Sequence, residues 1–346
     1  MKHQTTRYGE IPFYKIGTFG NTADAFISKK LFLEYKTKYS FPKKGDILIS
    51  ASGTIGRAVI YDGKPAYFQD SNIVWIDNDE TLVKNDFLFY AYSNVKWNTE
   101  HTTILRLYND NFRNTLIPLP PLNEQNAIAN VLSDLDRYLC TLDALILKKE
   151  GVKKALSFEL LSQRKRLKGF NQAWQRVRLG DIANYLTSNL SVEQITQQGE
   201  IKVYDVNNLI GYTDTTFISD KPYISIVKDG SVGRVRILPP KTNILSTMGA
   251  LIANHKTTTE FLFYLLSNFD FKNFISGSII PHIYFKDYKE KTIFLPPLNE
   301  QSAIANILSA LDNEITSLKN KKRQFENIKK ALNHDLMSAK IRVLEK

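Results

Sequence analysis

An internal duplication is the feature that most constrains how this chain can fold. LPPLNEQNAIANVLSDLD at 119–136 returns as LPPLNEQSAIANILSALD at 295–312, with 15 of 18 positions identical at an offset of 176 residues. The offset holds without a gap to KKAL at 153–156 and 329–332, so a tract of roughly 45 residues is present twice. The chain is therefore built as two copies of one plan.

The part upstream of each constant tract varies, yet short stretches still match. FLFYAYSN at 87–94 corresponds to FLFYLLSN at 261–268, and GTIGR at 53–57 corresponds to GSVGR at 230–234. Each glycine-containing stretch stands between two apolar runs, which predicts two strands joined by a tight turn. The aromatic stretches are interpreted as short helices packed on that sheet, with rings in the core rather than stacked on bases.

The constant tract has the pattern of a long helix. Pro120 and Pro121 cannot lie inside a helix, Asn123 suits an N-cap, and Glu124 falls in the first turn, where the helix dipole favours negative charge. Apolar residues then recur at heptad spacing, and about 45 residues at 1.5 Å each would span roughly 65 Å. We expect the two helices to pair as an antiparallel coiled coil. Two separate amphipathic helices, each buried in its own domain, are the alternative.

These patterns predict an α+β fold, a tandem repeat with pseudo-twofold symmetry in which two α/β variable domains are separated by two long constant helices. The expected boundaries are 1–118 for the first variable domain, 119–167 for the first helix, 168–294 for the second variable domain and 295–346 for the second helix. The constant helices would set a fixed distance between the two variable domains, each of which could bind a different ligand. Double-stranded DNA, whose base edges repeat along an axis, suits such a device.

The composition favours a polyanionic partner and excludes several classes of protein. Lys and Arg outnumber Asp and Glu by 46 to 35, which gives a net charge of +11. A solvated surface with surplus lysine is the alternative explanation of that charge. No run of about 18 apolar residues exists, so no membrane span is expected. The single cysteine and the polar N-terminus indicate a reducing, cytoplasmic setting.

The sequence lacks the motifs that would indicate an active site. It contains no HExxH, no CxxC pair, no phosphate-binding GxxxxGK[ST] and no GxSxG. Five histidines and one cysteine are scattered without the spacing of a metal site. We therefore expect a non-catalytic chain. A coiled-coil adaptor without base readout and an enzyme with an unrecognised active site are the alternatives.

The order of the motifs resembles that of the specificity subunits of Type I restriction-modification systems. Two LPPLNEQ helix starts and two GTIGR-like turns enclose a linker, and LGDI at 179–182 opens the second variable domain. The linker residues that carry the resemblance are Arg166, Leu167, Gly169, Phe170 and Trp174. The resemblance covers essentially the whole chain.

The resemblance implies that each variable domain is a target recognition domain, which reads one half of an asymmetric, bipartite DNA site. The paired helices would fix the spacer between the half-sites and hold two methyltransferase subunits. Those subunits would bind S-adenosylmethionine and methylate adenine N6, while separate restriction subunits would bind ATP and Mg and translocate DNA. The chain itself would bind no cofactor.

One departure from the family pattern concerns the first variable domain. WQRVRLGDIANYL at 174–186 precedes GEIKVYDV in the second domain, whereas the first domain begins almost directly with GEIPFYKI at 9–16. We expect the first domain to lack an element on its N-terminal side. A truncated or silent specificity cassette is therefore an alternative function, because small domains tolerate little loss of burial.

Residues expected to contact DNA fall into three sets. The glycine-containing turns let the backbone approach DNA closely. The stretch before each PPLNEQ is the second set, because Arg106 aligns with His282 at the 176 offset, as two different half-sites would require. YFQDSN, with Gln69 and Asp70, is the third. The candidates are Thr54, Arg57, Gln69, Arg106, Tyr108, Arg113, Ser231, Arg234, Arg236, His282, Tyr284 and Lys286. For each of them, a surface residue without base contact is the alternative.

The starts of the two constant helices are the expected docking sites for the methyltransferase subunits, with structural caps as the alternative. The residues concerned are Leu122, Glu124, Gln125, Ile128, Leu298, Glu300, Gln301 and Ile304. The lysines further along the helices are interpreted as solvated, with docking as the alternative: Lys148, Lys149, Lys153, Lys154, Lys329 and Lys330.

Overall fold

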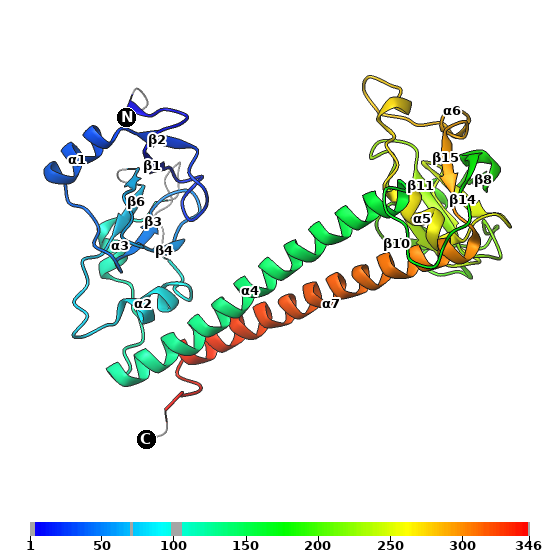
Figure 1. Cartoon of the computed structure of the whole chain (residues 1–346). Coiled ribbons are helices and arrows are strands. Elements are labelled where there is room, and N and C mark those ends of the chain that lie inside the picture. Colours follow the sequence, from blue (N-terminus) through cyan, green and yellow to red (C-terminus); the bar gives the residue numbers. More distant parts are fainter. Residues whose placement is uncertain (1–3, 70–71, 98–105, 345–346) are drawn as a thin grey trace. The chain divides into compact units, whose positions relative to one another are not determined.

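Each of the two packing units of the chain joins one variable domain to portions of both long helices (Figure 1). The computed structural model describes residues 4–69, 72–97 and 106–344. Unit 1 consists of Met1–Asp143 with Asn320–Lys346, and unit 2 consists of Ala144–Lys319. The units cut across the linear segments 119–167 and 295–346, because each long helix packs on one variable domain near its start and on the other near its end.

The variable domain of unit 1 contains two small sheets, with the strand orders β2-β1-β5 and β4-β3-β6. Strand β3 is buried along its whole length, and its side chains share a core with the helix α2. The elements are β1 (Ile11–Tyr14), β2 (Ala25–Ile27), α1 (Lys29–Lys38), β3 (Ile47–Ser50), β4 (Ala58–Ile60), β5 (Tyr67–Phe68), β6 (Ile73–Trp75), α2 (Asn85–Tyr92) and α3 (Asn109–Arg113).

The variable domain of unit 2 is larger and contains the sheets β10-β9-β13 and β12-β11-β14-β8 and the pair β15-β7. Its elements are β7 (Gln175–Arg178), η2 (Leu179–Asp181), β8 (Ala183–Thr187), η3 (Val192–Gln194), β9 (Ile201–Tyr204), β10 (Leu209–Thr213), β11 (Tyr223–Val227), β12 (Val235–Leu238), β13 (Asn243–Ile244), β14 (Met248–Ala253), α5 (Thr259–Ser267), η4 (Lys272–Phe274), α6 (Phe285–Tyr288) and β15 (Thr292–Leu295).

The strand-turn-strand prediction is confirmed in both units. β3 pairs antiparallel with β4, and β11 pairs antiparallel with β12, with the glycine-containing turns between them. The aromatic stretches form α2 and α5, in which Phe87 and Phe261 have no exposed surface. Their interpretation as core residues is therefore confirmed.

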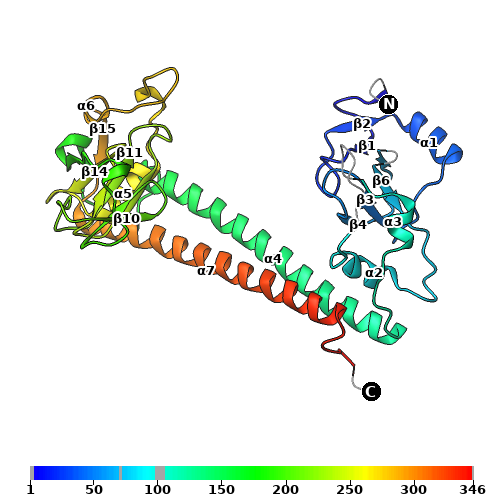
Figure 2. The ribbon, with the colours of Figure 1, turned by 180° about the vertical axis from the view of Figure 1, so that it is seen from behind.

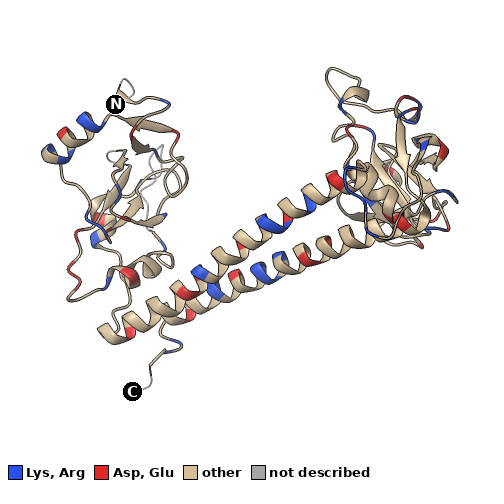
Figure 3. Ribbon diagram, viewed as in Figure 1, with Lys and Arg blue, Asp and Glu red and all other residues tan. Residues whose placement is uncertain are grey.

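The constant tracts form α4 (Leu122–Leu161) and α7 (Leu298–Met337), each 40 residues long. Within each unit, the segments of α4 and α7 lie side by side in both views (Figure 2). Acidic and basic residues are interspersed along both helices (Figure 3). Cross-helix ion pairs show that the segments run antiparallel, with Lys149–Glu314 and Lys153–Asp312 in unit 2, and Lys322–Asp143 and Lys329–Asp136 in unit 1. Among the described residues, no helix has the length and apolar character needed to cross a membrane.

A buried glutamine fixes the start of α7 to the variable domain of unit 2. Gln301 has no exposed surface. Its Nε2 donates to the carbonyl oxygens of Lys256 at 2.9 Å and Pro296 at 2.8 Å. Its Oε1 accepts from Thr257 Oγ1 at 2.9 Å and from the backbone N–H of Thr258 at 3.0 Å. The side chain thus joins the last turn before α5 to the first turn of α7.

Gln125 does the same at the start of α4 in unit 1. Its Nε2 donates to the carbonyl oxygens of Leu82 at 3.1 Å and Pro120 at 2.8 Å, and its Oε1 accepts from the backbone N–H of Lys84 at 2.8 Å. Both glutamines satisfy their polar atoms inside the protein, as buried amides must if they are not to destabilise the fold.

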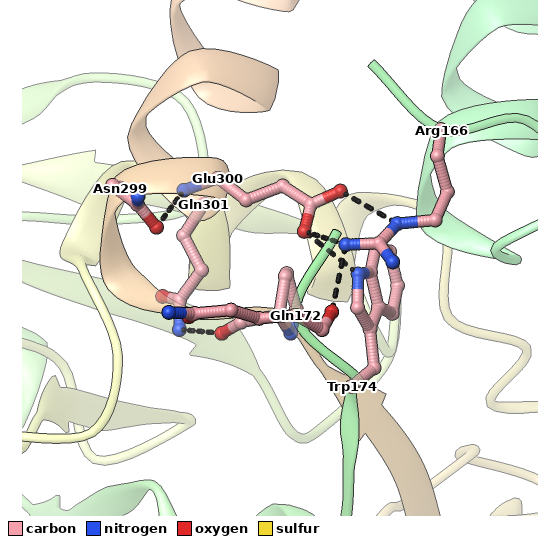
Figure 4. A network of polar contacts seen from close by, with 7 residues as sticks. Arg166, Gln172, Trp174, Asn299, Glu300 and Gln301 are labelled. Carbon is pink, nitrogen blue, oxygen red and sulfur yellow. Dashed lines mark hydrogen bonds and ion pairs between the residues drawn. The ribbon is translucent and has the colours of Figure 1, made fainter. Parts of the chain in front are cut away.

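The neighbouring glutamate ties the linker to the start of α7 (Figure 4). Glu300 has no exposed surface and accepts hydrogen bonds from Arg166 at 2.6 and 3.1 Å and from Trp174 Nε1 at 3.0 Å. In unit 1, Glu124 instead accepts from the backbone N–H groups of Val343 at 2.7 Å and Leu344 at 3.2 Å. Each unit therefore closes the segment that follows one long helix onto the start of the other.

These contacts argue against docking by the side chains of most of the helix-start residues. Six of them are 8% exposed or less and make internal contacts, so their side chains have almost no surface for a partner: Glu124, Gln125, Ile128, Glu300, Gln301 and Ile304. Of the eight, only Leu122 and Leu298 are well exposed, at 37% and 47%. For the other six, burial and internal contacts agree better with the alternative of a structural cap.

Candidate nucleic-acid interface

In unit 2, the turn between β11 and β12 and the loop before α6 form one surface. The backbone N–H of Gly230 donates to Pro281 O at 2.9 Å, and that of Ile283 donates to Lys228 O at 2.9 Å. A β-bridge joins Asp229 to His282, which lies 53 residues later in the chain. Two of the candidate sets, distant in sequence, therefore meet.

Unit 1 brings its corresponding sets together in the same way. The backbone N–H of Leu107 donates to Ala51 O at 2.8 Å, and a β-bridge joins Ser52 to Arg106. The turn with Thr54 and the stretch before α3 are thus neighbours. The equivalence that the 176 offset predicts between Arg106 and His282 is confirmed in the backbone, because each of them forms a β-bridge to a residue just before the glycine-containing turn, Ser52 and Asp229 respectively.

His282 is held in a defined orientation. Its Nδ1 lies 2.7 Å from Asp229 Oδ1. With the carboxylate as acceptor, Nδ1 is the donor, and Nε2 is the ring nitrogen left for a second hydrogen bond. The ring stacks with Tyr284 at a centroid distance of 6.4 Å, and Lys286 Nζ lies 5.5 Å from the Tyr284 ring. The cluster offers a second imidazole nitrogen, an aromatic face and a cation within a few residues.

The equivalent cluster in unit 1 has a different polar residue beside the same aromatic one. The guanidinium carbon of Arg106 lies 5.9 Å from the Tyr108 ring, and Tyr108 is 43% exposed. A guanidinium presents only donors, whereas a neutral histidine also presents an acceptor. The two units therefore have the same framework with different hydrogen-bonding chemistry.

The arginines of the β12 side are partly committed to internal contacts. Arg234 Nη2 donates to Asn207 Oδ1 at 2.8 Å, and Arg236 Nη1 donates to Asn207 O at 2.8 Å, while its guanidinium lies 5.2 Å from the Tyr204 ring. Asn207 and Asp229 are site residues that the sequence interpretation missed. The Asp-Val-Asn-Asn turn at 205–208 and the Lys-Asp-Gly-Ser turn at 228–231 were the available signals, since such runs mark turns with side chains bonded to backbone.

The side chains of two further candidates of unit 1 form hydrogen bonds with the backbone of the same unit. Arg57 Nη1 donates to Phe19 O at 3.0 Å, and Gln69 Oε1 accepts from the backbone N–H of Ile16 at 3.4 Å. These contacts agree better with the alternative of a structural residue.

The remaining candidates are exposed. Thr54 and Ser231 lie in the turns, and Arg113 at the end of α3 forms an exposed ion pair with Asp110 at 3.4 Å. Asp70 lies outside the described residues. Whether any of these residues contacts a base stays a prediction.

The second glycine of each turn is required by packing. Gly56 and Gly233 have φ angles of +78° and +80°. A Cβ atom there would lie 2.2 Å from Trp97 Nε1 and 2.6 Å from Phe271 Cδ2. An aromatic ring, rather than open space for a ligand, therefore covers the Cα of this glycine. Within the described ranges, no group of three or more His, Cys, Asp or Glu residues is arranged to hold a metal ion.

A family model described as the type I restriction modification DNA specificity domain matches residues 1–149 and 171–327, one region in each half of the chain. A putative type I restriction enzyme specificity subunit of Haemophilus influenzae is 62% identical over 137 residues, which are 39% of this chain and 36% of that protein. The chain thus matches only about a third of that relative's length. The putative type I restriction enzyme MjaX specificity subunit of Methanocaldococcus jannaschii is 28% identical over 338 residues, 86% of this chain and 79% of that protein.

Solved structures share the fold at low sequence identity. The S subunit of a type I restriction-modification system from M. genitalium has a TM-score of 0.64 and 20% identity, and the match covers 97% of this chain and 91% of that one. A chain from a study of complex assembly and conformational transition in a type I restriction-modification system has a TM-score of 0.52 and 15% identity, covering 85% of this chain and 82% of that one. The likeness therefore extends over both variable domains and both long helices.

Proposed function

The chain belongs to the family of type I restriction modification DNA specificity domains, and from this premise we propose that it is the subunit that selects the DNA sequence on which a type I restriction-modification complex acts. Each variable domain reads one half of a bipartite site. The long helices carry the partner subunits, and the catalytic chemistry belongs to those partners.

One observation carries the proposal. Both units build the same paired surface from a tight turn and a second loop, yet place Arg106 in one and His282 in the other at equivalent positions. Direct readout requires hydrogen-bonding groups that differ with the base to be read. Recognition of two different half-sites requires the same backbone surface in both units with different hydrogen-bonding side chains on it.

The chemistry of each reader suggests its role. The paired donors of Arg106 match the two acceptors on the major-groove edge of guanine. His282, with Nδ1 held by Asp229, matches an exocyclic amino group through Nε2. Lys286 and Arg113, which are both exposed, contact phosphates, and such contacts position the protein without specifying sequence.

The partner subunits dock on exposed faces of α4 and α7. Leu122 and Leu298, at the starts of the two helices, are apolar and exposed, as residues that anchor a partner must be before assembly. The methyltransferase subunits, two in number, hold S-adenosylmethionine, and the restriction subunits hold ATP and Mg.

The experiment that tests the proposal is co-expression with the type I methyltransferase subunit of the same genome, followed by genome-wide mapping of N6-methyladenine. A single bipartite motif that appears only with this chain supports two readers. A motif with one half only identifies one variable domain as silent. A stable complex without any methylation contradicts the proposal and favours an adaptor without base readout.

A further inference from the structure

In unit 2, the loop 275–282 exposes large apolar side chains beside the candidate DNA surface. Ile279 is 92% exposed and Ile280 is 54% exposed, while Ile275 and Tyr284 on either side are 43% and 48% exposed. Both views show this segment, in gold, standing out from the sheets of the unit (Figures 1 and 2). A single exposed isoleucine is ordinary on a protein surface, but two adjacent ones on a projecting loop form an apolar tip that a partner can cover.

Backbone hydrogen bonds hold this loop in a closed shape. Ser276 and His282 form a β-bridge, in which Ser276 N–H donates to His282 O at 2.9 Å and His282 N–H donates to Ser276 O at 2.7 Å. Gly277 has a φ of +89°, and a Cβ atom there would lie 2.3 Å from Ile280 O. The turn is therefore tight, and little conformational entropy remains to be lost when its tip is bound.

The two ends of the loop are fixed to the rest of the unit. On the N-terminal side, Phe271 is buried, and its ring packs edge-on against that of Tyr288 at a centroid distance of 5.3 Å. On the C-terminal side, Pro281 O accepts the N–H of Gly230, which places the loop against the turn between β11 and β12. The apolar tip is thus carried on a support that is tied to the core and to the candidate DNA surface.

The charges around the loop indicate which partner covers the tip. The segment 271–286 contains two lysines and no acidic residue. Lys228, Lys286 and Lys289 line one hollow of about 420 Å³ together with Tyr284. Double-stranded DNA matches both features, because its phosphates lie on the outside and its base pairs stack as apolar planes within. An apolar surface of a protein would cover the isoleucines but would leave the lysines unmatched.

We propose that Ile279 and Ile280 insert between two stacked base pairs and kink the DNA within the half-site that unit 2 reads. Proteins that insert apolar side chains in this way unstack one base step and bend the duplex by about 20–90°. Three residues of extended chain span about 10 Å, so the unstacked step lies within about three base pairs of the base that His282 contacts. The ease with which that step unstacks then adds to specificity. The inference rests on the proposed function, since it requires that unit 2 binds DNA.

The test uses the complex of this chain with the methyltransferase subunit, at saturating concentration, and duplexes that carry the motif found by methylation mapping. Energy transfer between dyes at the two ends measures the bend. A fluorescent base analogue, placed at one position at a time other than the methylated adenine, reports unstacking in the half-site that His282→Ala relaxes.

Three variants of the chain are compared. Ile279→Ser removes the apolar side chain without adding a charge, at an exposed position where folding does not depend on it. Ile279→Leu keeps an apolar side chain of the same volume. Val192→Ser is the matched control, because Val192 is apolar and 65% exposed in the same unit.

We expect the unmodified complex, Ile279→Leu and Val192→Ser to bend the duplex by about 20° or more and to raise the fluorescence of the analogue at one step of this half-site. With Ile279→Ser, the rise in fluorescence and most of the bend should be lost, while the slope of affinity against salt stays the same, because no phosphate contact is removed.

A bend and a fluorescence rise that Ile279→Ser leaves unchanged overturn the inference, and so does an equal loss with Val192→Ser. Failure of the Ile279→Ser chain to co-purify with the methyltransferase subunit also overturns it, because the loop then contacts protein. Specific binding of a straight, fully stacked duplex overturns the inference and leaves the proposed function intact. The absence of any specific binding by the unmodified complex contradicts the proposed function and this inference together.

Discussion

Lys153 Nζ lies 2.5 Å from Asp312 Oδ1, and the hydroxyl of Tyr264 donates to the other oxygen of the same carboxylate at 2.9 Å. Three elements of unit 2, α4, α7 and α5, therefore meet at one aspartate. Unit 1 repeats the arrangement with Lys329, Asp136 and Tyr90. The interpretation of the helix lysines as solvated is thus wrong for Lys153 and Lys329.

Asp312→Asn should lower the free energy of unfolding by about 1 kcal/mol. The change removes the charge-assisted hydrogen bond, but the carboxylate is 37% exposed, and solvent screens the ion pair. Urea denaturation followed by circular dichroism measures the loss. Asp143→Asn, which removes a more exposed cross-helix ion pair with Lys322, is the control and should cost less. Equal losses would show that the tyrosine hydrogen bond contributes nothing.

Gln301→Leu should destabilise the protein by about 3 kcal/mol or more. The substitution leaves the N–H of Thr258 and the carbonyl oxygens of Lys256 and Pro296 without their partner in a buried place, and each such group costs about 1–3 kcal/mol. Ser302→Ala, at the exposed neighbouring position, is the control for altering the first helical turn. A loss below 1 kcal/mol for Gln301→Leu would mean that water replaces the amide.

His282→Ala and Arg106→Ala should each relax one base position of the methylated motif, in different halves of the site. Loss of a base contact costs about 1–3 kcal/mol in affinity for the cognate sequence. Competition binding with oligonucleotides changed at single positions, together with methylation mapping, measures the effect. Asp229→Ala should shift the same position as His282→Ala, since Asp229 fixes the ring.

Lys286→Ala should behave differently from these two. Loss of a phosphate contact weakens binding to all sequences alike and lowers the slope of affinity against salt by about one counterion. Binding measured over a range of salt concentrations separates the two behaviours. A change of motif with Lys286→Ala would show that this residue reads a base.

Alkaline pH should destabilise the chain through its buried tyrosines. Burial raises the pKa of Tyr223 to about 12, and burial together with the hydrogen bond to Asp312 raises the pKa of Tyr264 above its ordinary 10.0. Below about pH 10 both folded and unfolded states keep the proton, so the stability is unaffected there. Above that pH the unfolded chain ionises first, and stability falls as the pH rises through the folded-state pKa. Unfolding measured between pH 8 and 12 should show a shallower fall for Tyr264→Phe than for the unmodified chain, with Tyr8→Phe, 84% exposed, as the control.

Two glycine substitutions should change stability in opposite directions. Gly233→Ala forces a Cβ into the Phe271 ring at a positive φ and should cost about 1–3 kcal/mol. Gly151→Ala should stabilise by up to about 1 kcal/mol, because Gly151 lies within α4 with nothing within 4 Å of the added Cβ. Thermal unfolding of the two variants measures both effects. Destabilisation by Gly151→Ala would show that the glycine has a packing role.

The sequence predicted those features that local pattern determines. The duplication located both helices, and the paired prolines located where they begin to within two residues. The N-cap expected at Asn123 is wrong, because that residue lies inside α4, which begins at Leu122. Apolar runs around glycine located the β3–β4 and β11–β12 hairpins. The alignment of Arg106 with His282 also needed nothing beyond the offset of the repeat.

Features that depend on partners far apart in the sequence could not be predicted. In the sequence, Gln301 resembles any polar residue in a first helical turn. Only the fold shows that it is buried and that Thr257, 44 residues earlier, donates a hydrogen bond to its side chain. The sequence alone predicts Arg234 to be a basic residue available to DNA. In the structure it donates a hydrogen bond to Asn207, which lies 27 residues earlier in the chain. The sequence gives the chemical type of a charged or amide side chain. Whether that side chain is exposed depends on which distant parts of the chain the fold packs against it.

The discontinuous make-up of unit 1 has a consequence for how the chain is synthesised. Unit 2 is one continuous stretch, so all of its contacts can form while the ribosome is still adding the last residues. The first variable domain must wait, because Leu336 and Met337 belong to the same core as Ile128 and Leu132. The half that is made first is thus the half that folds last, and until the end of α7 has been made its apolar surface depends on protection by other means.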